Sequence, residues 1–197
     1  RLMTEMRQAG LPCRGYQPTA YSAELAGALP GKTVALRADM DALPITERTA
    51  LSFASRNDGM MHACGHDIHM ASAVGAAWLL CAHLDALHGR VRFLFQPDEE
   101  GRGGARAMIA AGCLEPDVAA VYGGHVSPDL PLGSVGIRYG AFYATSVPFT
   151  VTVCGKACHA AIPERGIDAL CCAAEMISVL DHLPPSVCGE PFVLRVC

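Results

Sequence analysis

Three apolar segments, each of which stops at a group of polar side chains, constrain the fold of this chain more than any other feature. They read TVALRAD, GRVRFLFQ and DVAAVYGG and occupy residues 33–39, 89–96 and 117–124. Short apolar runs that are β-branched or alternating are typical of strands. An Ala-rich segment at about residues 68–87 has the length of a helix, and residues 103–112 predict a shorter one. Helices between apolar strands predict an α/β fold with helices on the faces of a sheet.

The pattern changes after about Ala144. Three further elements are predicted there, a strand, a helix and a second strand, at residues 148–156, 166–183 and 191–197. Such an order, with one face of the sheet towards solvent, is typical of an α+β domain. We therefore expect two domains, residues 1–144 and the beginning of a second one over residues 145–197.

Composition narrows the class of protein. Hydrophobic residues make up 51% of the 197 residues, which favours a substantial core over disorder. The formal net charge is −4, whereas a domain that binds nucleic acid usually has a basic face. The longest apolar stretch, residues 70–82, is shorter than the ~20 residues that cross a bilayer. We expect neither nucleic acid nor a membrane as a partner.

The ten cysteines are irregularly spaced, which favours reduced thiols and a cytoplasmic protein. A redox role for Cys154 with Cys158, or for Cys171 with Cys172, is a weaker alternative, because free cysteines more often fill a core. The first residue is Arg1, and the residues after it are typical of a helix interior. We expect further sequence upstream, which could include a removed targeting segment.

The polar groups that follow the three strands are the candidates for a functional site. In open α/β sheets, sites form where the carboxyl ends of the strands meet the loops. We expect the groups after the strands, together with the loop MHACGHDIHMA, to converge there. Their members are Asp39, Asp41, Glu99, Glu100 and His125, with Cys64 and His66 in the loop.

Two of these pairs indicate a metal. Cys64 and His66 are separated by one glycine and can face the same ion, and thiolate and imidazole both bind zinc-like metals. Such a pair is a weak signal alone, and a buried cysteine beside a helix-capping His-Asp pair is the alternative. Glu99 and Glu100 repel each other, and a divalent cation resolves the conflict by binding one and leaving the other as a base. A solvated loop tip is the alternative for this pair.

His125 ends an uncharged strand, so it is either a ligand or a core histidine with one satisfied nitrogen. We expect Asp39 and Asp41 to orient ligating histidines, or else to be N-capping residues in a polar loop. His62 and His69 flank the Cys-Gly-His turn and are candidates for the same supporting role.

Four blocks between residues 36 and 170 resemble, in order, the signature blocks of metal-dependent amidohydrolases related to aminoacylase and carboxypeptidase. They read LRADMDALPITE, MHACGHDIHMA, FQPDEEGRGGARAMIAAG and GKACHAAIPERGIDAL. They are most similar to the branch of hippurate hydrolases, indole-acetyl-amino-acid hydrolases and N-acyl-amino-acid deacetylases. Asp98 departs from the Ala usual in this branch, and Cys158 from the Gly or Ser before the histidine of the lid.

The resemblance implies a zinc-peptidase-like catalytic domain, with a mixed sheet and helices on both faces, and an α+β lid that also serves dimerisation. It implies two divalent metal ions, zinc or manganese with nickel or cobalt as alternatives, held by Cys64, His66, Glu100 and His125. Glu99 would be the general base, and His159 in the lid would stabilise the oxyanion, typically in the partner subunit's site. The remaining metal-binding histidine of the family lies beyond this chain, so we expect a fragment of a longer protein.

The expected reaction is hydrolysis of the amide bond of N-acyl amino acids, or of related small amides and dipeptides, by metal-activated water. The expected partners are this small substrate and, through the lid, a second copy in a homodimer. Two alternatives stay open. A thiol hydrolase with Cys64 as nucleophile would need a lowered thiol pKa and leaves Glu99 and Glu100 unexplained. An inactive metal-binding or dimerisation fragment is the other.

Overall fold

The computed structural model describes residues 1–16, 19–101, 103–140, 142–143 and 149–183. The chain divides into two compact units, residues 1–131 and residues 132–197. The domain boundary predicted between residues 144 and 145 falls inside the second of these units.

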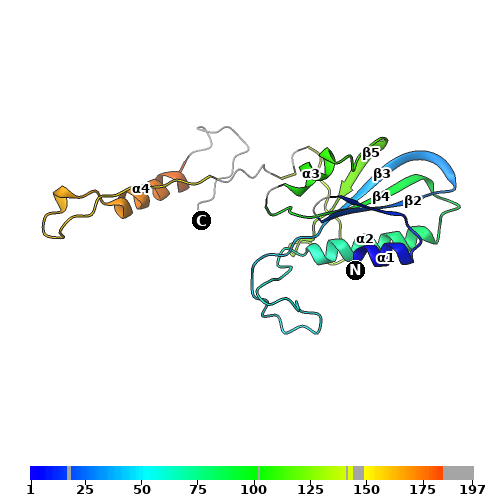
Figure 1. Ribbon diagram of the computed structural model, residues 1–197, viewed down its shortest axis with the longest axis horizontal. Coiled ribbons are helices and arrows are strands. Elements are labelled where there is room, and N and C mark those ends of the chain that lie inside the picture. The colour runs from blue at the N-terminus through cyan, green and yellow to red at the C-terminus, as the bar shows by residue number, and fades with distance from the viewer. Residues whose placement is uncertain (17–18, 102, 141, 144–148, 184–197) are drawn as a thin grey trace. The chain divides into compact units, whose positions relative to one another are not determined.

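The first unit is built on a five-stranded mixed sheet of order β1-β2-β4-β3-β5 (Figure 1). Its strands are β1 (Cys13–Tyr16), β2 (Ala20–Ala26), β3 (Leu29–Asp39), β4 (His88–Gln96) and β5 (Val118–Gly123). β3 runs parallel to both β4 and β5, while β2 is antiparallel to β1 and β4. The carboxyl ends of β3, β4 and β5 therefore lie at the same edge of the sheet.

Helices cover both faces of this sheet, as predicted (Figure 1). They are α1 (Leu2–Gln8), α2 (His66–Cys81) and α3 (Gly104–Ala110). Side chains alternate between the faces along the central strand β4. Phe93 and Phe95 join the core beneath α1 and α2, whereas Leu94 joins a second core that includes Met108 of α3. The predicted α/β architecture is confirmed.

Helix α2 ends at Cys81, earlier than predicted. The backbone N–H of Ala28, just before β3, donates to the carbonyl of Leu84, and that of Leu29, the first residue of β3, donates to the carbonyl of Leu87. These bonds hold the chain after Cys81 as turns beside the start of β3, and the helix cannot continue. The strands β1 and β2 are not predicted by the sequence pattern, because their Ala, Ser, Gly and Glu residues have weak β-propensity.

The second unit contains the 3₁₀ turn η1 (Pro163–Arg165) and helix α4 (Ala169–Asp181) among its described residues. α4 confirms the helix predicted for residues 166–183. Asp168 precedes the helix, and its side chain accepts hydrogen bonds from the backbone N–H groups of Leu170 and Cys171. No helix in the described part of the chain is long and apolar enough to cross a membrane.

The strand predicted for residues 148–156 is wrong where the structure describes it. Residues 149–156 form no strand, and Lys156 pairs with Ile167 only in an isolated bridge. An extended segment needs a neighbouring strand for a ladder of hydrogen bonds, and the described residues after 131 contain none. The strand predicted at 191–197 lies outside the described residues.

Candidate metal centre

The polar side chains predicted after the three strands meet at the edge where β3, β4 and β5 end. Ligand atoms in three sets lie within 4.8 Å of one another, and the sets are Cys64-His66-His125, Asp39-His66-His69 and His66-Glu99-Glu100. His66 belongs to all three sets. The convergence follows from the topology, because the parallel strands deliver their carboxyl ends, and the start of α2, to one place.

Gly65 shapes the turn that carries Cys64 and His66. Its φ of 81° lies in the left-handed region, which a glycine adopts without steric cost. A Cβ at this position would lie 2.5 Å from Cγ2 of Val126. The start of α2 can therefore approach the segment after β5 only with a glycine at this position.

The main chain sets the tautomer of His66. Its Nδ1 lies 3.1 Å from the carbonyl oxygen of Asp41, so Nδ1 carries the proton and donates it. Nε2 then holds a lone pair, and this buried atom has no hydrogen-bond partner among the described residues. Its nearest acidic atoms are Oδ2 of Asp39 at 3.7 Å and Oε1 of Glu100 at 3.9 Å. A buried lone pair that faces carboxylates is an arrangement that a cation satisfies.

The main chain sets the tautomer of His125 as well, and its Nε2 also keeps a lone pair. Its Nδ1 donates to the carbonyl oxygen of Val126 at 2.7 Å, and Sγ of Cys64 lies 3.3 Å from Nε2. Burial, and after it the Glu100 carboxylate, raise the pKa of the Cys64 thiol to about 11. A thiol with this pKa keeps its proton at neutral pH unless a cation replaces it.

Asp41 holds the loop that carries the two glutamates. Its Oδ1 accepts the backbone N–H of Glu99 at 3.1 Å, and its Oδ2 accepts that of Glu100 at 2.8 Å. Burial alone would raise the pKa of Asp41, but these hydrogen bonds outweigh it and lower the pKa. Asp41 therefore contacts the glutamates through its carboxylate and His66 through its carbonyl.

Asp39 contacts a histidine outside the predicted ligand set. Its Oδ1 accepts a hydrogen bond of 2.5 Å from Nδ1 of His69, and its Oδ2 accepts one of 2.6 Å from Nη1 of Arg37. The Nε2 of His69 accepts the backbone N–H of Val126 at 3.0 Å. Sequence reasoning missed Arg37, although a charged residue inside the apolar run TVALRAD is a signal that could have revealed it.

His159 lies in the second unit, in a turn before η1. Its side chain is exposed, and its Nδ1 accepts the backbone N–H of Ala161 at 3.1 Å. Its predicted role towards the substrate stays a prediction.

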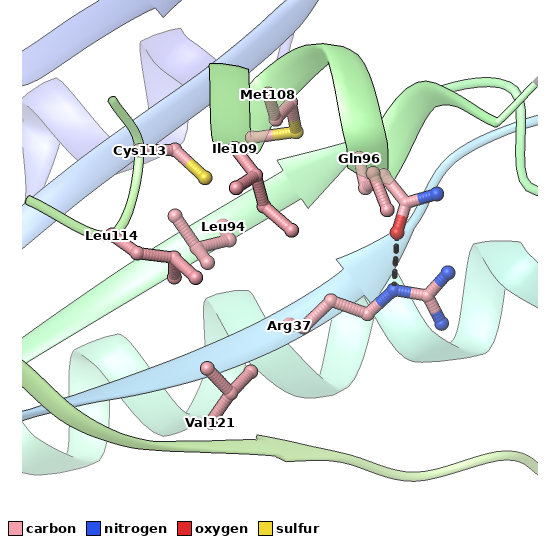
Figure 2. A pocket seen from close by; sticks show the side chains of 9 residues that line it. Arg37, Leu94, Gln96, Met108, Ile109, Cys113, Leu114 and Val121 are labelled. Atoms are coloured by element: carbon pink, nitrogen blue, oxygen red, sulfur yellow. Dashed lines mark hydrogen bonds between the residues drawn. The ribbon is translucent and has the colours of Figure 1, made fainter. Parts of the chain in front are cut away.

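An apolar pocket lies between α3 and the sheet (Figure 2). It is lined by Arg37, Leu94, Gln96, Ala105, Met108, Ile109, Cys113, Leu114 and Val121. Arg37 and Gln96 form its polar end, where Nε of Arg37 donates to Oε1 of Gln96 at 2.8 Å. The residues that line this pocket offer apolar contact and include none of the candidate ligands.

The donor set at the strand ends fits divalent metal ions. A thiol, a second imidazole and the carboxylates of Glu99 and Glu100 surround Nε2 of His66, which has no hydrogen-bond partner in the part of the chain that the structure describes. Thiolate and imidazole suit zinc, cobalt and nickel, and the carboxylates also suit manganese.

The chain belongs to peptidase family M20/M25/M40, whose model matches residues 35–195. It is 48% identical over 165 residues to an N-acetylcysteine deacetylase of Bacillus subtilis (strain 168). The aligned residues make up 84% of this chain and 43% of that protein. The chain is 42% identical over 181 residues to an N-acyl-L-amino acid amidohydrolase of Geobacillus stearothermophilus. This alignment makes up 90% of this chain and 49% of that protein. The chain thus spans less than half the length of these two relatives.

A solved structure of a dinuclear metal binding peptidase of the M20 family from Bacillus subtilis has the same fold. It aligns with a TM-score of 0.66 and 45% identity, and covers 70% of this chain and 38% of that chain. The predicted family and the predicted mixed sheet with helices are both confirmed.

Proposed function

We propose that this site hydrolyses the amide bond of N-acyl amino acids with two divalent metal ions. The observation that carries the proposal is the buried Nε2 of His66, which has no partner in the described part of the chain and faces a second imidazole, a thiol and two glutamates. The similarity to a deacetylase and an amidohydrolase of N-acyl amino acids supports this substrate class. The similarity to a dinuclear metal binding peptidase supports two metal ions.

The residues that would hold the metal ions are Cys64, His66, Glu100 and His125. Bound metal ions supply Lewis-acid activation of water and of the substrate carbonyl. Glu99 takes a proton from the attacking water onto its carboxylate and delivers it to the nitrogen of the leaving amino acid as the amide bond breaks. Asp41 keeps the Glu99 main chain in place through the hydrogen bond to its N–H.

Zinc and manganese are the metals we propose first, with nickel or cobalt as alternatives. The thiolate and imidazole ligands favour zinc, while the carboxylate ligand accepts manganese.

Residues 145–197, which lie within the second unit, are proposed to be the beginning of the lid and dimerisation domain. His159 would donate a hydrogen bond to the oxyanion of the tetrahedral intermediate in the partner's site. A donor of this kind is typically worth about 3–4 kcal/mol of transition-state stabilisation. The active form would be a homodimer through this domain.

The test measures metal content and turnover together. Metal-free protein is reloaded with zinc or manganese, its metal is quantified by mass spectrometry, and hydrolysis of N-acetyl amino acids is followed. We expect near-stoichiometric metal and turnover in the starting protein. Glu99→Gln should keep the metal and lose about 10²-fold or more in rate, because it removes only the base.

Cys64→Ser and Glu100→Gln should instead lose metal. The control is Asp85→Asn, an exposed carboxylate beyond the far end of α2, which should change neither quantity. Full metal content in both ligand variants would overturn the ligand set, and wild-type turnover in Glu99→Gln would overturn the assignment of the base.

A further inference from the structure

We propose that Arg37, Asp39 and His69 form a chain of hydrogen bonds whose role is to position His125 for metal binding. The inference rests on the proposed function, because positioning matters only if the imidazole of His125 is a ligand. None of the three belongs to the proposed ligand set, so they are positioning residues.

Each link of this chain has one donor and one acceptor. The backbone N–H of Val126 can only donate, so Nε2 of His69 is the acceptor and Nδ1 carries the proton. That proton points to Oδ1 of Asp39, whose Oδ2 accepts from Arg37. One neutral tautomer of His69 therefore satisfies every link. Nε of Arg37 donates to Gln96, which anchors the outer end of the chain (Figure 2).

His69, at the inner end of these hydrogen bonds, holds His125 in two ways. Val126, whose N–H is held by His69, is also the residue whose carbonyl accepts Nδ1–H of His125. In addition, the rings of His69 and His125 pack edge to face, with centroids 4.6 Å apart and planes at 74°. Fixing Val126 thus fixes the imidazole whose Nε2 lies against Cys64.

The burial of polar side chains at His69 and Asp39 argues against a role in packing alone. His69, Ala73 and Ala77 are spaced four residues apart and form the buried face of the helix. Asp39 and His69 are 1% and 8% exposed, and burying such polar groups costs free energy unless all their hydrogen bonds are made. An apolar residue would fill the same space without that cost, so core formation alone does not explain why hydrogen-bonded polar residues occupy these positions.

The experiment tests the hydrogen bonds of the two ring nitrogens of His69 separately. His69→Asn keeps an N–H group at the position of Nδ1 but has no atom that reaches Val126. His69→Gln places an oxygen near the position of Nε2 and can accept the Val126 N–H again. His83→Asn, a change at an exposed histidine beyond α2, is the matched control.

Two measurements use the metal-free protein, namely amide exchange of Val126 and the NMR signals of the His125 ring. A third is the zinc dissociation constant, from competition with a chelating dye. For His69→Asn we expect about tenfold or faster exchange at Val126, displaced ring signals of His125, and a zinc dissociation constant about 10–100-fold higher. His69→Gln should recover part of each change, and His83→Asn should match the wild type.

Unchanged His125 ring signals in His69→Asn would overturn the proposal, even if Val126 exchanged faster. Unchanged zinc affinity beside displaced ring signals would overturn it too. If the wild type bound no zinc, the proposed function would fail, while the ring signals of His125 would still decide whether the chain positions it. If His69→Asn does not fold, His69→Gln and Arg37→Met are judged by the same signals.

Discussion

At the scale of single residues, the candidate site depends on which nitrogen of each histidine keeps its lone pair. His66 and His125 both donate their Nδ1 protons to main-chain carbonyls, which leaves Nε2 as the free nitrogen in both rings. A neutral imidazole in water exchanges between two tautomers, but here the main chain selects one before any metal binds. Less reorganisation is then needed on binding, which is the general advantage of a preorganised site.

The raised pKa of Cys64 predicts an unreactive thiol in the metal-free protein. With a pKa of about 11, roughly one thiol in 10,000 is ionised at pH 7, and alkylation requires the thiolate. We expect iodoacetamide to modify Cys64 more slowly than the exposed Cys154 and Cys172, as measured by peptide mass spectrometry. Fastest modification at Cys64, with turnover that survives chelation, would favour the thiol hydrolase instead.

Gly65→Ala should weaken both the fold and the site. The new Cβ would have to displace Val126, and φ would remain in the unfavourable left-handed region. We expect a loss of about 1–3 kcal/mol in the free energy of unfolding and weaker zinc binding. Urea denaturation and zinc titration measure the two effects.

Gly75→Ala is the control for this change. Gly75 lies on the exposed side of α2 with no atom within 4 Å of an added Cβ. Alanine there should stabilise the helix by about 0.5–1 kcal/mol. Equal effects of the two substitutions would mean that the contact between Gly65 and Val126 is not what matters.

At the scale of elements, Arg92 ties together β2, β4 and the loop between α3 and β5. Its guanidinium donates to Glu24 and to the carbonyls of Cys113 and Glu115, and the residue is 8% exposed. Arg92→Gln would remove the guanidinium that the Glu24 carboxylate and the two carbonyls share, so we expect a loss of about 1–3 kcal/mol in the free energy of unfolding. Arg90→Gln removes an exposed partner of the same Glu24 and should cost less than about 1 kcal/mol. Similar urea midpoints for both variants would contradict this.

Helix α4 should depend on pH through its N-terminal cap. Hydrogen bonds from Cys171, followed by that from Leu170, lower the pKa of Asp168 below its usual 3.8. The capping carboxylate therefore stabilises the helix fully above pH 3.8, and this stabilisation is lost as the pH falls through the lower pKa of the folded state. The amide shifts of Leu170 and Cys171 should titrate below that value in the wild type and stay flat in Asp168→Asn. A midpoint at or above pH 3.8 would contradict the cap.

At the scale of the whole molecule, all proposed ligands lie in the first unit, residues 1–131. Zinc at about 1,000 times its dissociation constant should stabilise that unit by about 4 kcal/mol. We expect hydrogen exchange to slow on zinc addition within residues 1–131 and to change little over residues 149–183. The effect should disappear in Cys64→Ser and persist in Cys154→Ser. An equal slowing in both units would show that metal binding orders more of the chain than the unit that holds the ligands.

The sequence by itself was sufficient for the α/β class, the three apolar strands and the polar residues at their ends. Hydrophobic periodicity is a local property, so TVALRAD and GRVRFLFQ indicate strands without knowledge of their neighbours. The convergence of Cys64, Glu100 and His125 then followed from a general rule about the carboxyl ends of strands in such sheets. The isolated segment 149–156 shows the limit of this reasoning, because alternation alone does not supply a partner strand.

Only the tertiary structure decided the chain of hydrogen bonds behind the site. His69 meets Asp39 across 30 positions of sequence and Val126 across 57. The sequence makes His62 and His69 equal candidates for supporting the Cys-Gly-His turn, and nothing in the residues near them shows which one takes that role. Its role depends on how close folding brings three separate segments, and on which atom of each faces the others. Tautomers and hydrogen-bond chains are set by such distant contacts, which local sequence patterns do not contain.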